Sequence, residues 1–124
     1  MSDSVLHPIH YCSLSSAADA IRDGQLSPVE LTEKLLSRID SVDGQLKSYA
    51  TVMTEQAMEA GRKAEQEIQA GNYKGPLHGI PIAVKDLCFT AGTRTMGGLK
   101  VLRDFVPDYD ATVVHKLREA GAVI

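Results

Sequence analysis

The sequence predicts an α/β fold in which N-terminal helices precede the first strands and the crossover helix of a mixed, largely parallel sheet. Two observations support this prediction. Apolar residues recur at helical spacing early in the chain, and two continuous apolar runs, Ile80–Val84 and Ala122–Ile124, flank a helical pattern near its end. This order is typical of a crossover that enters a parallel sheet. We expect a helical region over residues 1–74 and the start of an α/β core over residues 75–124.

Length, composition and charge restrict the class of protein. The 124 residues are 44% hydrophobic and 23% charged, which is ordinary for a globular domain. The net charge is -3 and no basic stripe is present, so we expect no nucleic-acid partner. No apolar run approaches the roughly 20 residues of a membrane-spanning helix. The first residues lack the pattern of a signal peptide, so a cytoplasmic location is expected.

Two helices are expected in the first part of the chain. Ser15 and Ser16 can cap a short helix over residues 17–23. Ser27 is the predicted cap of a longer helix, and Glu30, three residues later, completes a capping box. The apolar stripe of this helix favours a role in the core, although a homodimer through the N-terminal helices is an alternative; its members are Leu31, Leu35, Leu36, Ile39 and Val42.

The remaining elements follow the same signals. Tyr49–Met53 is a candidate strand, and Thr54 is expected to cap a helix over residues 55–70 whose apolar face is mostly alanine. Asp110 is expected to cap a last helix over residues 111–120, with its valines inward. The final apolar run reaches the last residue, so we expect further polypeptide downstream.

Cysteines and histidines give little support to a metal or redox site. Cys12 and Cys88 follow no metal or redox spacing and are expected to be reduced and unpaired. His7 and His10 could be imagined as metal ligands, but they lack a partner at ligand spacing. We therefore predict neither a metal nor a cofactor.

Lys85 is the candidate catalytic residue. It follows the apolar run 80–84, and α/β sheets place functional groups at the carboxyl ends of their strands. Burial there would disfavour the ammonium form and favour a neutral amine that can accept a proton. The alternative is a lysine that extends from a strand end into solvent and pairs with Asp86.

The run from Gly75 to Asp86, which reads GPLHGIPIAVKD, resembles the first catalytic segment of the amidase-signature family. The resemblance continues through Ala91–Thr95 and Asp110–Val114. It implies a mixed, largely parallel sheet between helices. It also implies a Ser–cisSer–Lys triad in which Lys85 acts as a neutral base, through a bridging serine, on a nucleophilic serine that attacks the amide carbon.

Both serines of that triad belong to a Gly/Ser-rich run that this sequence does not contain. The Ser13, Ser15 and Ser16 cluster lacks glycine neighbours and suits helix caps better than a nucleophile. We therefore expect a small-molecule amide as substrate, and no catalysis by these residues unless other polypeptide supplies the serines.

Several alternatives stay open at this point. The same triad occurs in the A subunit of glutamyl-tRNA amidotransferases, which releases ammonia from glutamine. A non-catalytic domain or an interaction module, docking through the stripe of residues 31–42, is an alternative of another class. Arg94–Gly98 departs from the family pattern, so no substrate contact is assigned there. His78 could be a secondary group of the site but is expected to be structural, and His115 is expected at the surface.

Overall fold

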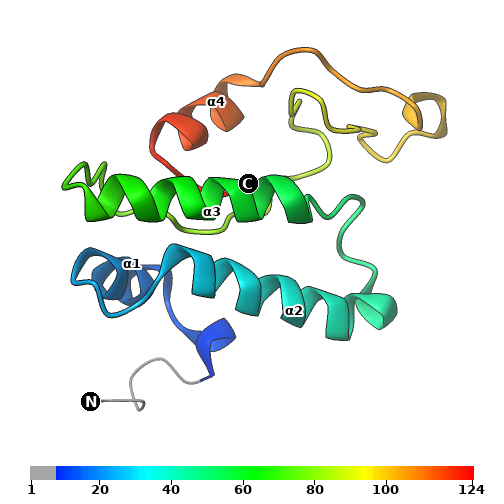
Figure 1. Ribbon diagram of the computed structural model, residues 1–124. Helices are drawn as coiled ribbons and strands as arrows, with labels where there is room; N and C mark the ends of the chain where they lie inside the picture. The colour runs from blue at the N-terminus through cyan, green and yellow to red at the C-terminus, as the bar shows by residue number, and fades with distance from the viewer. Residues whose placement is uncertain (1–7) are drawn as a thin grey trace.

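The computed structural model describes residues 8–124, and helices carry most of its regular structure (Figure 1). Between residues 8 and 124, extended pairing is limited to two isolated bridges, Pro81 with Val123 and Thr90 with Thr93. The elements, in chain order, are the 3-10 helix η1 (Ile9–Tyr11), α1 (Leu14–Arg22), α2 (Pro28–Leu46), α3 (Thr54–Gln69), the 3-10 helix η2 (Lys100–Leu102) and α4 (Thr112–Glu119).

The helices α2 and α3 lie side by side and run in opposite directions (Figure 1). Small residues of α3 are buried, as its alanine-rich face predicts: Ala57 and Ala64 are 7% and 3% exposed. A Cβ atom at Gly61 would lie only 3.2 Å from Oγ1 of Thr32, so a methyl group there would press on the Thr32 side chain of α2.

Ser27 is the N-cap of α2, as predicted. Its Oγ accepts hydrogen bonds from the N–H groups of Val29 (3.0 Å) and Glu30 (3.1 Å). The same hydroxyl donates to Oε1 of Glu65 on α3 (2.5 Å), so one cap ties two helices together. The reciprocal half of the predicted capping box is wrong, because the Glu30 carboxylate accepts from Lys34 instead (2.6 Å).

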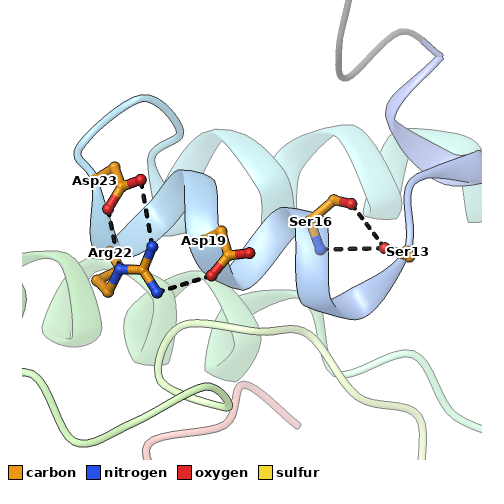
Figure 2. Close-up of polar contacts among 5 residues, drawn as sticks. All are labelled: Ser13, Ser16, Asp19, Arg22 and Asp23. Carbon is orange, nitrogen blue, oxygen red and sulfur yellow. Dashed lines mark hydrogen bonds and ion pairs between the residues drawn. The ribbon is translucent and has the colours of Figure 1, made fainter.

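The predicted cap of α1 is also wrong. The helix begins at Leu14, and Ser13 is its N-cap. Its Oγ accepts from the N–H of Ser16 at 3.1 Å and also contacts the Ser16 hydroxyl (Figure 2). Ser15 and Ser16 therefore lie inside the first turn, since three serines within four residues offered several equivalent starts.

At the other end of α1, Arg22 donates to the carboxylates of Asp19 (2.8 Å) and Asp23 (3.0 Å) (Figure 2). The hydrogen bond to Asp23, followed by the attraction of both carboxylates, raises the pKa of Arg22 above its ordinary value. These groups are exposed, and water screens their attraction, so they define the helix end without adding much to stability.

The predicted strand Tyr49–Met53 is wrong, because residues 47–53 form an irregular connection. Lys47 ends α2 in the left-handed conformation (φ 51°), and Oδ1 of Asp43 accepts from the N–H of Ser48 at 2.7 Å. The N–H groups of Ser48 and Tyr49 thus bond to Asp43 at the helix end, and the carbonyl of Ala50 accepts from the Arg94 side chain (3.2 Å). Thr54 is the first residue of α3 and not its cap, which is Met53.

The predicted cap of α4 is wrong as well. The carboxylate of Asp110 accepts from the N–H of Ala91 (2.8 Å) and from Nε of Arg118 (2.9 Å), so it ties a loop to the helix instead. Ala111 occupies the cap position. Of the two valines expected inward, Val114 is fully buried but Val113 is 51% exposed.

The two apolar runs of the predicted crossover pair in the parallel direction, as expected. The N–H of Val123 donates to the carbonyl of Ile80 (2.9 Å), and the N–H of Ile82 donates to the carbonyl of Val123 (2.7 Å). Pro81 sits between the two bonds with its ring nitrogen facing away, so its missing N–H costs no bond here. The pairing is one bridge long, and the mixed sheet stays a prediction.

The hydrophobic core lies where α1 and the start of α2 meet the segment that leads to Lys85. Alanines of α1 let the elements approach closely, while larger aliphatic side chains fill the space between them. The division of the chain at residue 75 stays a prediction, although Ile80 belongs to this same core. The buried members are Ala17, Ala18, Ala20, Ile21, Leu26, Leu31 and Ile80.

Candidate active site

Lys85 lies three residues beyond Ile82, the last residue of the parallel pairing, and its side chain is exposed. Within residues 8–124, the predicted burial of Lys85 is therefore wrong. The cause is visible in the run before it: only one extended segment pairs with residues 80–82, and Ala83 is exposed.

A groove of about 700 Å³ opens beside Lys85. One wall is the apolar face of α2, and another is the segment 81–86 with Lys85 and Asp86 at its end. The connection 48–53, the loop 90–95 and the last two residues complete the lining. Charged and hydroxyl groups from several of these segments lie among the apolar side chains, and a mostly apolar hollow with a few polar groups is typical of a small-molecule site.

The groove divides the apolar stripe predicted on α2. Leu31 is buried in the core, where 4% of its surface is exposed. Farther along the helix, Leu35, Ile39 and Val42 line the groove and are partly exposed. Only the first part of the stripe thus belongs to the closed core of these residues.

Asp86 holds the loop that faces Lys85. Its Oδ1 accepts from the N–H of Met96 (3.1 Å), and its carbonyl accepts from the N–H of Gly97 (2.7 Å). The carbonyl of Lys85 accepts from the N–H of Cys88, which turns the chain sharply after the lysine. Asp86 makes these bonds to the loop and not the ion pair with Lys85 that the sequence offered as an alternative. Sequence reasoning missed this role, since no local signal says which amide a carboxylate will meet.

His78 is buried, as expected for a structural histidine. Its side chain is completely enclosed, its Nε2 lies 2.8 Å from Oε2 of Glu67 on α3, and its Nδ1 accepts from the N–H of Lys74 (3.1 Å). The ion pair and hydrogen bond with Lys74, helped by His78, hold the pKa of the Glu67 carboxyl below its ordinary value of 4.5, although desolvation acts in the opposite direction.

Of the other residues considered from the sequence, Cys88 lies next to Lys85, since its N–H binds the Lys85 carbonyl, whereas Cys12, His10 and His115 do not line the groove. Cys12 and Cys88 are both free thiols, and His115 is exposed, as predicted. His10 lies exposed in η1, whereas His7 falls outside the described residues. Among residues 8–124, no three His, Cys, Asp or Glu side chains form a cluster that could hold a metal ion.

Comparison with known proteins decides the family. A family model described as Amidase matches residues 30–124, which include Lys85 and every wall of the groove. The chain belongs to the amidase-signature family. The resemblance noted in the GPLHGIPIAVKD run is thereby confirmed.

Relatives within the family include both hydrolases and amidotransferase subunits. The "Putative amidase AmiD" of Mycobacterium tuberculosis is 55% identical over 111 residues, which is 90% of this chain and 23% of that protein. The A subunit of the glutamyl-tRNA(Gln) amidotransferase of Geobacter sulfurreducens is 44% identical over 119 residues, which is 96% of this chain and 23% of that protein. The chain thus spans about a quarter of the length of these relatives.

Solved structures agree with the assignment. The native peptide amidase of Stenotrophomonas maltophilia matches 94% of this chain and 24% of its own, with a TM-score of 0.87 and 32% identity. The fold of these residues is therefore that of an amidase-family segment. In residues 8–124 no helix is both long and apolar enough to cross a membrane.

Proposed function

We propose that this chain contributes the lysine base of an amidase that hydrolyses a carboxylic amide to an acid and ammonia or an amine. The observation that carries the proposal is the place of Lys85, at the end of the family's lysine-containing segment and on the rim of the groove. The nucleophilic and bridging serines of a Ser–cisSer–Lys triad would come from polypeptide outside these 124 residues.

In the proposed mechanism, Lys85 acts as a general base. The neutral amine at Nζ accepts a proton from the bridging serine, which accepts one from the nucleophilic serine as its oxygen attacks the amide carbon. The protons then return to the leaving nitrogen, and water releases the acid from the acyl-enzyme. A base of this kind works best away from solvent, so the segment that carries the serines must also cover Lys85.

Asp86 supports the same assignment. Because its side chain and carbonyl bind the N–H groups of Met96 and Gly97, the turn after Lys85 is fixed to a second loop. A catalytic group must be held within about an ångström of its productive position, and two loops tied together supply such rigidity.

The test is Lys85→Ala in the active polypeptide or assembly that contains this chain, with release of ammonia or acid from linear amides as the readout. We expect activity to fall by at least about 10³-fold, as when a triad member is removed. Lys100→Ala is the matched control, because Lys100 is exposed in η2 and does not line the groove. A Lys85→Ala variant that keeps full activity would sink the proposal.

A second function in the same family is favoured by the amidotransferase relative at 44% identity. In that case the amide is glutamine, and the ammonia passes to a second reaction. Comparing ammonia release from glutamine with release from other linear amides separates the two. No hydrolysis of either class, with a Gly/Ser-rich run absent from the coding sequence after Ile124, would leave a non-catalytic domain or interaction module.

A further inference from the structure

His78 lies in the turn between α3 and the segment that ends at Lys85, and both of its ring nitrogens are used. The Lys74 N–H donates to Nδ1 (3.1 Å), so Nδ1 carries no proton. The neutral ring then carries its proton on Nε2, which donates to Oε2 of Glu67 at 2.8 Å. A fully enclosed imidazole with two directed hydrogen bonds has one orientation only.

The carbon edge of the same ring packs against the turn after α4. A Cβ atom at Gly121 would overlap Cδ2 of His78 and lie only 3.0 Å from its Cγ. Gly121 also has a φ of +81°, which glycine alone adopts without strain. The backbone of Gly121 therefore packs directly against the ring. Because Glu67 of α3 holds that ring, it also fixes the distance between α3 and the end of α4.

The first bond between the two paired segments is made at this contact. The N–H of Gly79, the next residue after His78, donates to the carbonyl of Gly121 (2.9 Å). The bonds of Val123 to Ile80 and of Ile82 to Val123 follow in the same register. Lys85 comes three residues after Ile82, so a shift of the register would move it by about 3.3 Å for each residue.

We propose that His78 is a positioning residue for Lys85. Together with Glu67, it fixes the register in which the lysine-bearing segment pairs with residues 121–123. The kinetic part of this inference rests on the proposed amidase function, whereas the structural part does not. A buried histidine that serves stability alone would lower the free energy of unfolding without a selective effect on that register or on turnover.

Two substitutions at His78 separate the two ring nitrogens. In His78→Gln, the side-chain amide can still donate to Glu67; in His78→Asn, it can accept from the Lys74 N–H but no longer reaches Glu67. Glu67→Ala removes the same link and leaves the enclosed His78 ring in place, although it also removes the ion pair with Lys74. It therefore remains informative if His78→Asn does not fold.

The first measurement is amide hydrogen exchange on the chain itself. We expect His78→Asn and Glu67→Ala to speed exchange of the Ile82 and Val123 amides by about 10-fold or more, with little change at the Leu31 amide of α2. His78→Gln should stay within about 3-fold of the parent. Unchanged exchange at Ile82 and Val123, or an equal rise at all three amides, would overturn the proposal.

The second measurement is steady-state hydrolysis by the active polypeptide or assembly. His78→Asn and Glu67→Ala should lower kcat by on the order of 10- to 100-fold with KM nearly unchanged, and His78→Gln should restore most of it. A parallel loss in kcat and in folded protein would overturn the role in catalysis. If Lys85→Ala stays active, the proposed function fails, while the exchange result still decides whether His78 sets the register.

Discussion

The two ends of α2 lie in different surroundings. At its start, Leu31 packs against α1 and the segment of Ile80 in a closed core. Toward its end, Ile39 and Val42 face the groove, and Leu46 is 67% exposed. One continuous helix therefore belongs first to a finished core and then to an open surface. The start of α2 thus belongs to the closed core, whereas its later turns form one wall of the groove beside Lys85.

The largest effect on stability should come from the closed end. Leu31→Ala removes a side chain that is 4% exposed and leaves a cavity, so we expect a loss of about 2–5 kcal/mol in the free energy of unfolding. Ile39→Ala, on the groove side, should cost under about 1 kcal/mol. Urea denaturation of both variants measures the contrast. Equal losses would mean that the groove face is as tightly packed as the core.

An intermediate effect should come from the turn after α4, where Gly121 meets the His78 ring. Gly121→Ala adds a methyl group where the His78 ring already lies, and it forces alanine into a left-handed conformation, so we expect about 2–4 kcal/mol. Gly24→Ala is the matched control, because its φ is +70° with nothing within 4 Å of the added atom. It should cost only about 1–2 kcal/mol. Thermal unfolding of the two variants measures the difference. Equal losses would contradict the contact assigned between Gly121 and His78.

The smallest effect should appear in the pH dependence of stability. The pKa of Glu67 is held below its ordinary value of 4.5 by Lys74 and, less strongly, by His78. The folded state is therefore favoured at pH values above 4.5, and that gain is lost as the pH falls through the lowered value. Glu67→Gln should flatten the decline in unfolding free energy between about pH 5 and pH 3. A decline as steep as in the parent would assign it to other carboxylates.

Much of the helical arrangement could be predicted from local signals. The start of α2 carries a serine, a proline and a helical stripe in the right order, and the structure begins the helix there. Caps failed where neighbouring residues offered equivalent choices, as at Ser13, or where a carboxylate found a distant partner, as Asp110 does with Ala91. Such partners depend on which loops meet in space, and a local pattern does not contain that information.

The site was predicted less evenly. The position of Lys85 after an apolar run, and the parallel pairing of that run, could be read from the sequence. The exposure of Lys85 could not, because burial depends on what covers the far face of residues 80–84. The strand expected at Tyr49–Met53 failed for a related reason. β-Propensity describes a residue's fit to a half-buried pleated surface, whereas here the N–H groups of Ser48 and Tyr49 bond to Asp43 at the end of α2.

Pro81 has a consequence for association between molecules. Its nitrogen points away from the bond pair that joins residues 80–82 to Val123, toward the edge where another extended chain could add. An extended segment added on that side would find no N–H donor at Pro81, so it could not form a complete ladder there. The apolar run before Lys85 therefore admits only an incomplete ladder on that side, whether the added segment belongs to the same polypeptide or to another molecule.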